Sequence, residues 1–212
     1  MISDQANPPT LGAILAGGLA RRLGGGDKPL RMVGGRTVLD RLIDRLAPQV
    51  TRLVLNANDD PGRFHGLGLP IVADTLPNHP GPLAGVLAAL EWTALSDPAI
   101  EWVVTVPGDA PFVPRDLVRR LHAERQRDNA IFACAASQGR THPVAALWPV
   151  SVRDALRRAV AEDGIRKVDA FTQRHRCSVV AWPAEPVDPF FNVNTPADLA
   201  EADRLITIHP AL

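Results

Sequence analysis

Basic side chains and glycines gather in one short segment of the sequence. Residues 15–30 read LAGGLARRLGGGDKPL, with five glycines and three basic residues. The backbone N–H groups of such a segment can converge on an anionic oxygen, because glycine has no side chain to hold a ligand away. Arg21, Arg22 and Lys28 add positive charge beside them. The segment predicts a site for a phosphorylated ligand, with a flexible turn carrying solvated basic residues as the alternative.

Two common phosphate-binding motifs do not fit this segment. A P-loop requires Ser or Thr after its lysine, and here Pro29 follows Lys28. A dinucleotide-binding fingerprint requires GxGxxG at the start of a helix, but the glycines lack that spacing and Pro29 would interrupt the helix. A glycine-rich loop that binds phosphate through its backbone remains.

Three further apolar runs end in amides or carboxylates. Asn56 lies near the end of the run 52–58, Asp74 ends the run 69–74, and Asp109 ends the run 101–109. Ligands of open α/β sheets bind beyond the carboxyl ends of the strands, so we expect these side chains beside the glycine-rich segment. Asn and Asp also form ordinary turns at strand ends, and that alternative stays open for each of them.

Seven apolar runs predict strands, and amphipathic segments between several of them predict helices. The runs span 11–17, 52–58, 69–74, 101–109, 129–136, 141–149 and 177–183. The expected helices fall within 37–47, 83–95, 114–127, 151–163 and 195–206. Several runs are apolar on successive residues, which is typical of strands covered on both faces. We therefore expect an α/β fold with a three-layer, doubly wound, mostly parallel sheet.

Two of the expected helices open with a capping pattern. Ser151 precedes Asp154 by three residues, and Thr195 precedes Asp198 by three. Pro196 then falls at the first helical position, where a helix tolerates proline best. Both patterns predict helix N-termini.

Composition limits the classes of protein that fit. The 212 residues are 46% hydrophobic, and 23 Lys plus Arg balance 23 Asp plus Glu, which argues against a nucleic-acid partner. No apolar run reaches the about 18 residues that cross a bilayer, so we expect no membrane partner. Cys134 and Cys177 lie far apart without a CxxC motif, which favours a reduced, cytoplasmic protein whose cysteines fill the core. We expect a disordered lead-in over residues 1–10 and a single domain over 11–212.

Several stretches together resemble one family. The glycine-rich segment resembles the signature of nucleotidyltransferases that act on phosphorylated acceptors. Further matching stretches are VLNAN (54–58), HPGPLAG (79–85), PGDAPF (107–112), HPVAALW (142–148) and FNVNTPADL (191–199). They occur in the family's order, and the chain resembles the molybdenum cofactor guanylyltransferases from about residue 11 to 206. It departs from them at Ala20, Leu23 and Ala110, where the family usually has Ser, Met, and Thr or Met.

The resemblance implies a Rossmann-like nucleotidyltransferase fold and a defined reaction. GTP and molybdopterin would give a guanine dinucleotide cofactor and pyrophosphate, with Mg²⁺ as the cofactor. The attacking phosphate oxygen of molybdopterin is already anionic, so no strong base is required. We expect in-line displacement at the α-phosphorus, in which positioning and electrostatics carry most of the catalysis.

The resemblance also assigns roles to residues. Lys28, Asp109 and Arg22 would be catalytic, with Lys28 and Arg22 on the triphosphate and Asp109 on the metal. The nucleotide-binding residues would be Leu15, Ala16, Gly17, Gly18, Lys28, Asn56, Asp74 and Asp109. Asn192 and Asn194 would face the pterin acceptor, although both also suit a turn before the Thr195 cap. His142 is expected to be a hydrogen-bonded residue near the pocket rather than a catalyst.

Two other functions remain open at this point. A related cytidylyltransferase or sugar-phosphate nucleotidyltransferase would share the fold, although relatives that use CTP usually begin the loop with LAAG rather than LAGG. A GTP-binding relative without turnover would differ in function, but the retained Lys28 and Asp109 argue against it. The resemblance further implies contacts with other proteins of cofactor assembly.

Overall fold

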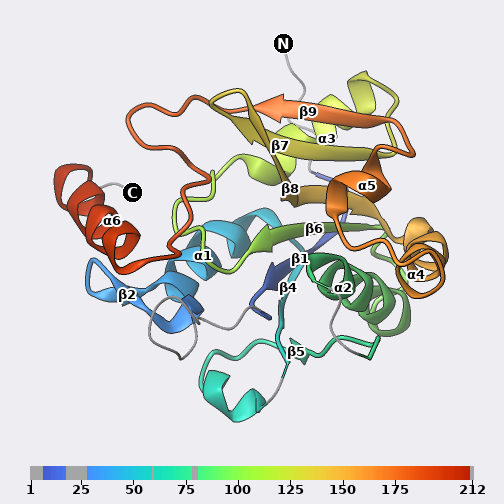
Figure 1. The fold of residues 1–212 in the computed structure, drawn as a ribbon, viewed down its shortest axis with the longest axis horizontal. Coiled ribbons are helices and arrows are strands. Elements are labelled where there is room, and N and C mark those ends of the chain that lie inside the picture. The colour runs from blue at the N-terminus through green and yellow to red at the C-terminus, as the bar shows by residue number, and fades with distance from the viewer. Residues whose placement is uncertain (1–6, 18–27, 59, 78–80, 211–212) are drawn as a thin grey trace.

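A seven-stranded sheet organises the protein (Figure 1). The computed structural model describes residues 7–17, 28–58, 60–77 and 81–210. The strands are β1 (Thr10–Leu15), β4 (Arg52–Asn56), β5 (Ile71–Val72), β6 (Trp102–Pro107), β7 (Phe132–Ser137), β8 (Arg140–Pro149) and β9 (Cys177–Ala181). Their order is β5-β4-β1-β6-β8-β7-β9, and among them β8 runs antiparallel to its neighbours. The expected mostly parallel α/β fold is confirmed.

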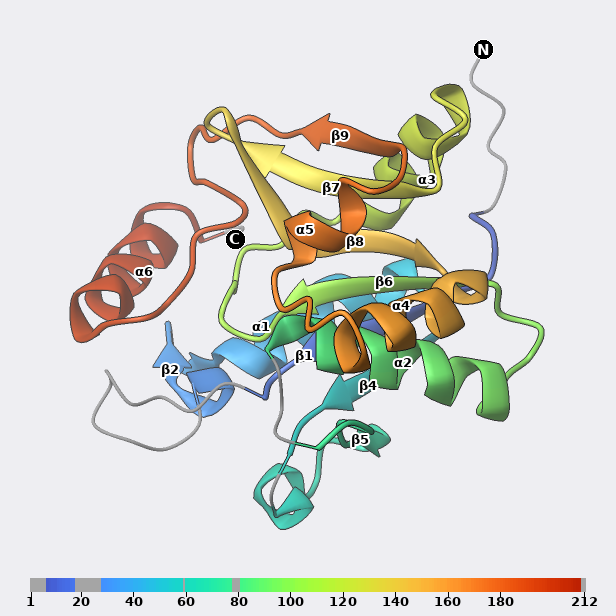
Figure 2. The ribbon, with the colours of Figure 1, turned by 45° about the vertical axis from the view of Figure 1, so that its right-hand side comes forward.

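Helices cover both faces of the sheet. They are α1 (Val38–Leu46), α2 (Pro82–Ser96), α3 (Leu117–Arg127), α4 (Arg153–Ala161), α5 (Val168–Thr172) and α6 (Pro196–Ile208). One apolar cluster holds the buried residues of α1, α3 and α6, and a second holds those of α2, α4 and α5. α2 and α4 lie side by side in Figures 1 and 2. The three expected layers are therefore present.

The order of the strands creates a crevice at the carboxyl end of β1. The chain continues from β1 to β4 and β5 on one side, and then places β6 on the other side of β1. In this register Leu15 of β1 lies opposite both Asn56 of β4 and Pro107 of β6. Ligands of doubly wound sheets bind at such a switch point, because the connections leave it in opposite directions. The residues that follow these three strands therefore meet at one place.

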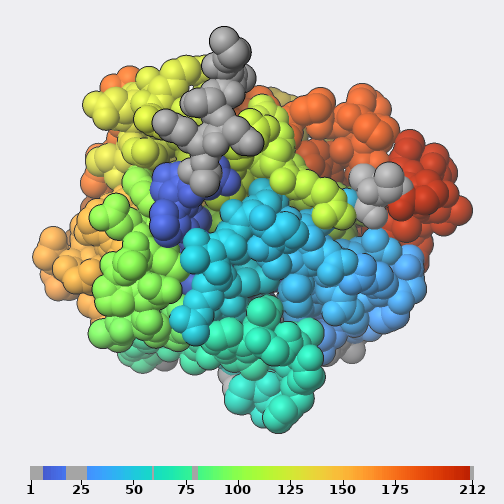
Figure 3. Space-filling model, turned by 180° about the vertical axis from the view of Figure 1, so that it is seen from behind, coloured from blue at the N-terminus to red at the C-terminus, as the bar shows by residue number. Residues whose placement is uncertain are grey.

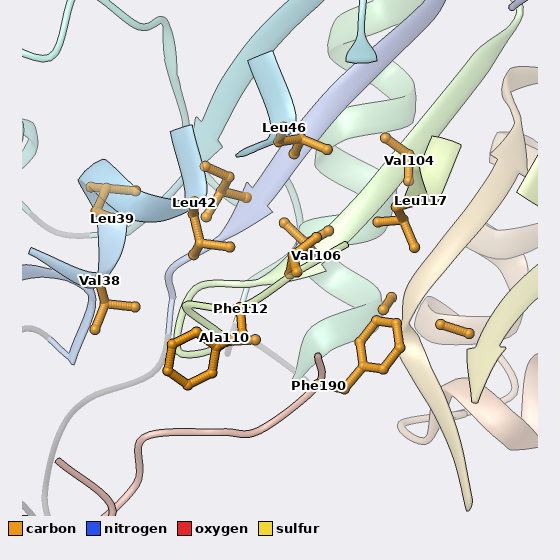
Figure 4. Close-up of a cluster of buried hydrophobic side chains, with 14 of the residues drawn as sticks. Val38, Leu39, Leu42, Leu46, Val104, Val106, Ala110, Phe112, Leu117 and Phe190 are labelled. Atoms are coloured by element: carbon orange, nitrogen blue, oxygen red, sulfur yellow. The ribbon is translucent and has the colours of Figure 1, made fainter. Parts of the chain in front are cut away.

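The apolar cluster around α1 supports one side of this crevice (Figure 4). The stripe expected over the first helix is buried at Val38, Leu39, Leu42 and Leu46. Thr37 closes the helix N-terminus in a capping box with Asp40. Each fully buried leucine of this stripe contributes about 2 kcal/mol of transfer free energy. The cluster fixes the helix that follows the glycine-rich segment against the sheet.

The segment after β6 is anchored in the same cluster. Ala110 and Phe112 are buried and are drawn beneath the end of β6 in Figure 4. Asp109 stands directly before them, and its carbonyl oxygen accepts a 2.8 Å hydrogen bond from the backbone N–H of Val193. The backbone around Asp109 is thus fixed by apolar packing on one side and by the C-terminal segment on the other.

Three local features differ from the expectations. The runs 129–136 and 141–149 form a hairpin, because Gln138 and Gly139 both adopt positive φ, as in the two-residue turns that join antiparallel strands. Only two residues of the run 69–74 pair as β5, since that run carries Pro70 and turns away after Val72. The cap predicted at Ser151 is wrong: Ser151 lies in a 3-10 turn, and α4 starts at Arg153 with no side-chain cap.

Other expectations hold or lie outside the described residues. The capping box of Thr195 with Asp198 is confirmed, with Pro196 at the start of α6. β1 begins at Thr10, one residue before the expected domain boundary. Residues 1–6 are not among those described, so the disordered lead-in and the single domain stay predictions. Within the described residues no helix has the length and apolar character needed to span a bilayer.

The two cysteines are free thiols that pack with the second apolar cluster. Cys134 is buried, and Cys177 is half-buried on the neighbouring strand β9. They fill core space as expected, because both side chains face the layer of α2, α4 and α5.

A buried histidine joins β1 to α3 at the opposite end of the sheet. His122 Nε2 lies 2.8 Å from Thr10 Oγ1, and its ring meets that of Trp102 edge-on. His122 is 5% exposed, and its Nδ1 has no hydrogen-bond partner among the described residues. Burial, with a smaller contribution from the charge of Arg125, lowers the pKa of His122 to about 4. The ring is therefore neutral in the folded protein at neutral pH.

This histidine predicts a loss of stability in mild acid. The folded pKa of about 4 lies below the ordinary histidine pKa of about 6.5, so the unfolded chain binds the extra proton first. The contribution of neutral His122 to the free energy of unfolding is complete above pH 6.5. It falls by about 3 kcal/mol as the pH drops towards 4. Urea unfolding of the His122→Gln variant should show a correspondingly flatter pH dependence between pH 7 and 4. The exposed His65→Gln variant is the control, and equal pH slopes in all three proteins would contradict this account.

Candidate functional site

A cavity of about 280 Å³ opens at the carboxyl ends of β1, β4 and β6. Its lining residues are Leu15, Ala16, Gly17, Lys28, Pro29, Asn56, Asn58, Asp74, Gly81, Pro82, Gly85, Pro107, Gly108, Asp109 and Val144. They come from distant parts of the chain, and the switch point of the sheet brings them together. The wall is mostly apolar and backbone, with a few polar side chains, as is typical of a small-molecule site.

Two glycines let the backbone elements of this wall approach closely. A Cβ at Gly108 would stand 2.9 Å from the carbonyl oxygen of Leu15 and 3.2 Å from Cα of Ala16. A Cβ at Gly85, on α2, would overlap Oδ1 of Asn56 and lie 3.0 Å from its Cγ. Side chains at these positions would push β6 and α2 away from β1. Glycine here is a packing requirement rather than a source of flexibility.

Two amides and a carboxylate form a fixed polar group on one part of the wall. Asn56 Nδ2 donates to Oδ1 of Asp74 at 2.9 Å, and Asn58 Nδ2 donates to Oδ2 at 2.9 Å. The backbone N–H of Asp74 donates in return to Oδ1 of Asn58 at 2.9 Å. Asn56 is also held by the carbonyl oxygen of Val72 at 3.0 Å. These bonds orient the Asp74 carboxylate.

A cation and a carboxylate lie on another part of the cavity wall. Lys28 Nζ lies 3.5 Å from Oδ2 of Asp109 and donates a 2.6 Å hydrogen bond to Oδ1 of Asn194. The Lys28 and Asp109 side chains are 22% and 19% exposed, so both reach the cavity while most of each is enclosed. Burial raises the pKa of Asp109, and the nearby Lys28 ammonium opposes that shift. Lys28 thus favours the ionised carboxylate.

The donor set fits some metals and not others. Among the described residues no group of three or more His, Cys, Asp or Glu side chains is arranged to hold a metal ion. A structural zinc site needs such a group. Mg²⁺ is instead bound by one or two carboxylates with substrate phosphates and water completing the shell. The Asp109 carboxylate fits a hard cation that is shared with a phosphorylated ligand.

Most of the residues predicted from the sequence meet in this cavity. Those that line it are Leu15, Ala16, Gly17, Lys28, Asn56, Asp74 and Asp109. Gly18 and Arg22 lie outside the described residues, as do Ala20 and Leu23. Asn192 and Asn194 do not line the cavity; Asn192 is exposed, and Asn194 contacts Lys28. His142 has the expected hydrogen bond, to Ser137, and is stacked on Phe190; that it is not a catalyst stays a prediction.

Other lining residues lie in stretches that the sequence singled out without giving each residue a role. Asn58 lies in VLNAN two positions after Asn56, at the same strand end. Gly81 and Pro82 lie in HPGPLAG, begin α2 and bring its N-terminus to the cavity wall. Sequence reasoning missed Val144: it lies in HPVAALW on the antiparallel strand β8, and no local pattern predicted that it faces the cavity.

This fold and this cavity together define a class of protein. A doubly wound sheet with a glycine-lined crevice at its switch point, flanked by a lysine and a carboxylate, is suited to a nucleotide held through its phosphates. The chain is thus an α/β protein of the nucleotide-binding class.

Comparison with known proteins gives the family. Residues 12–177 match the family described as MobA-like NTP transferase domain, and the chain belongs to this family of nucleotidyltransferases. It is 56% identical over 201 residues to a molybdenum cofactor guanylyltransferase of Nitrobacter hamburgensis, covering 95% of this chain and 96% of the relative. A relative of the same name from Rhodopseudomonas palustris is 57% identical over 199 residues, covering 94% and 95%.

A solved structure agrees in fold. Molybdopterin-guanine dinucleotide biosynthesis protein A from Archaeoglobus fulgidus superposes with a TM-score of 0.72 at 26% identity, covering 93% of this chain and 99% of that chain. The family resemblance stated from the sequence is confirmed.

The close approach of Gly85 to Asn56 yields a stability prediction. Gly85→Ala adds a methyl group that must displace the Asn56 amide from Asp74 and Val72. We expect a loss of about 1–3 kcal/mol in the free energy of unfolding, in spite of the better helix propensity of alanine. Denaturant unfolding measures it.

The double variant Gly85→Ala/Asn56→Ala is the control, because it removes the side chain that is struck. Its destabilisation should be smaller than the sum of the two single effects. Additive effects would show that the two positions do not meet.

Proposed function

We propose that this protein transfers GMP from GTP to molybdopterin, forming molybdopterin guanine dinucleotide and pyrophosphate. The observation that carries the proposal is the pairing of Lys28 with Asp109, at 3.5 Å, on the wall of the switch-point cavity. The names of relatives at 56% and 57% identity support the choice of substrates.

The two polar groups of the cavity suit the two ends of a nucleotide. The Asp74 carboxylate is an acceptor, and guanine offers N1–H and N2–H donors on one edge, whereas cytosine offers a single amino group there. Asn56 and Asn58 hold that carboxylate in place. Leu15, Ala16 and Gly17, with Gly18 beyond them, are the proposed backbone contacts to the base and ribose. Asn56 and Asp74 are the proposed contacts to the nucleoside.

Lys28 and Asp109 suit the triphosphate end. Lys28 donates to phosphate oxygens and stabilises the negative charge that builds on the departing pyrophosphate. Arg22 is proposed to assist it. Asp109 would hold Mg²⁺, which when bound supplies positive charge shared between the phosphates. The N-terminus of α2, at Gly81 and Pro82, adds the favourable field of a helix dipole to the same cavity.

The reaction needs no base from the protein. A phosphate oxygen of molybdopterin attacks the α-phosphorus of GTP, the bond to the bridging oxygen of pyrophosphate breaks, and no covalent enzyme intermediate forms. The protein brings two polyanions together and orients them. Asn192 and Asn194 are proposed on the acceptor side. Contacts with other proteins of cofactor assembly and a cytoplasmic location belong to the same proposal.

A direct assay tests this function. Incubation of the protein with GTP, Mg²⁺ and molybdopterin should release pyrophosphate and form the guanine dinucleotide, detected chromatographically. Asp109→Asn keeps the size of the side chain but removes the charge that would hold the metal. We expect it to lower the rate at least about 100-fold, the scale of losing one preorganised electrostatic group.

The matched control is Asp116→Asn, a carboxylate that binds Trp182 Nε1 away from the cavity. Its turnover should stay within about threefold of that of the unchanged protein. An Asp109→Asn enzyme that keeps most of its rate at saturating Mg²⁺ would overturn the metal assignment. Tight GTP binding with no dinucleotide formed would point to a relative that binds without turnover.

Nucleotide selectivity follows from the base end of the cavity. A ligand at 100 times its Kd stabilises the folded state by about 2.7 kcal/mol. In a chain of this size that is a rise in Tm of roughly 5–10 °C. Thermal melting with Mg²⁺ should show this rise for GTP and much smaller rises for ATP, CTP and UTP. A larger rise with CTP would favour a cytidylyltransferase instead.

A further inference from the structure

We infer that Asn194 is a positioning residue for Lys28, because it holds the ammonium group at the nucleotide cavity. It thereby links residues 192–194, called the acceptor-side segment below, to the bound nucleotide. The inference rests on the proposed function and deepens it. It assigns Asn194 an effect on GTP binding that exists before any acceptor is present.

The contacts of Lys28 leave part of its hydrogen-bonding capacity for a ligand. A lysine ammonium has three N–H donors. One is used by Asn194 Oδ1 at 2.6 Å, and Asp109 Oδ2 lies on another side at 3.5 Å. These are the partners of Lys28 in the described part of the chain, and Lys28 also lines the cavity. One donor is left for a ligand there.

The chemistry of the two partners differs. The Asp109 carboxylate reduces the net charge at Lys28, whereas the Asn194 amide is neutral and leaves that charge in place. An amide therefore orients the cation without weakening its attraction for phosphate. A freely rotating lysine would lose side-chain entropy on binding phosphate. A lysine that is already held loses less, so the nucleotide binds a prepared site.

The backbone around Asn194 is firm enough for this task. Its N–H donates to Oδ2 of Asp198 at 2.9 Å, and the same oxygen accepts from the N–H of Thr195 at 2.8 Å. One residue earlier, Val193 donates to the carbonyl oxygen of Asp109 at 2.8 Å. The acceptor-side segment is therefore bonded to both members of the Lys28–Asp109 pair, once by backbone and once by side chain.

Helix α6 extends the connection to the segment that follows Lys28. Oδ1 of Asp203, on α6, accepts a 2.6 Å hydrogen bond from the N–H of Gly34, between β2 (Met32–Val33) and β3 (Arg36–Thr37). Figure 3 shows α6 in red beside this blue segment. Lys28 lies shortly before β2, and Asn194 lies shortly before α6. The packing of α6 against this segment therefore keeps the Lys28 ammonium group close to the Asn194 side chain.

The test measures GTP affinity without acceptor. A fluorescent GTP analogue is titrated with Mg²⁺ into the full chain and its Asn194→Ala variant. We expect Kd to rise about 3- to 10-fold in the variant, the scale of the net contribution of one ordinary hydrogen bond. Gln126→Ala is the matched control, because the Gln126 amide is exposed on α3, does not line the cavity and should leave GTP affinity unchanged. A residue that contacts only the acceptor would leave it unchanged as well.

Two further variants separate positioning from a general structural effect. In a Lys28→Ala background, Asn194→Ala should weaken GTP binding no further, because the group that it holds is gone. Asn194→Asp retains an oxygen at the same chain length but adds negative charge beside Lys28, so it should bind GTP more weakly than Asn194→Ala. Asp198 accepts from the backbone N–H of residue 194, so the Asn194→Asp variant keeps that bond. If Asn194→Ala has a low Tm, the Asn194→Asp variant carries the test.

The outcomes distinguish the inference from the proposed function. An unchanged protein that binds no GTP would contradict the proposed function. GTP binding with the same Kd in Asn194→Ala would overturn the inference and leave that function standing. Equal losses of GTP affinity with and without Lys28 would also overturn it. In steady-state assays the inference requires a lower kcat or a higher KM for GTP, and an increase confined to the KM for acceptor contradicts it.

Discussion

The close approach of three backbone elements at the end of β1 is the constraint on which the site depends. β6 and α2 pack against the last residues of β1 and against Asn56 because Gly108 and Gly85 have no side chains. That contact leaves a cavity narrow enough for backbone groups to reach a ligand. It also places the ends of β4 and β6 on opposite sides of one crevice. The polar side chains that follow those strands can then act on a single bound molecule.

Within that crevice, hydrogen bonds hold the charged side chains in fixed orientations. Asp74 is oriented by two neutral amides, and Lys28 is oriented by one neutral amide and by a carboxylate. Burial raises the pKa of Asp109, and the nearby Lys28 ammonium opposes that shift and favours the ionised carboxylate. A nucleotide with its metal would replace one set of favourable contacts by another, at little reorganisation cost.

Strand-end reasoning predicted much of this site, and its failures have physical causes. Asn56, Asp74 and Asp109 follow apolar runs, and parallel pairing alone brings such positions to one edge. The sequence predicted that Asn194 faces the acceptor, and it gave no sign of the hydrogen bond that Asn194 accepts from Lys28, 166 positions away in the chain. The Ser151 cap failed because a 3-10 turn there uses the residues that would have begun the helix. Local patterns do not show which of two competing turns the packing will select.

The sequence by itself determined the α/β class, the strand-end carboxylates and the family, because hydrophobic periodicity and the order of motifs are properties of the linear chain. Only the tertiary structure decided which polar groups meet. The antiparallel placement of β8 brought Val144 to the cavity, and the docking of α6 brought Asn194 to Lys28. Both depend on long-range packing, which buries apolar faces that local sequence specifies without specifying their partners. The physical reason is that a hydrogen bond between distant residues forms only after the core has fixed their distance.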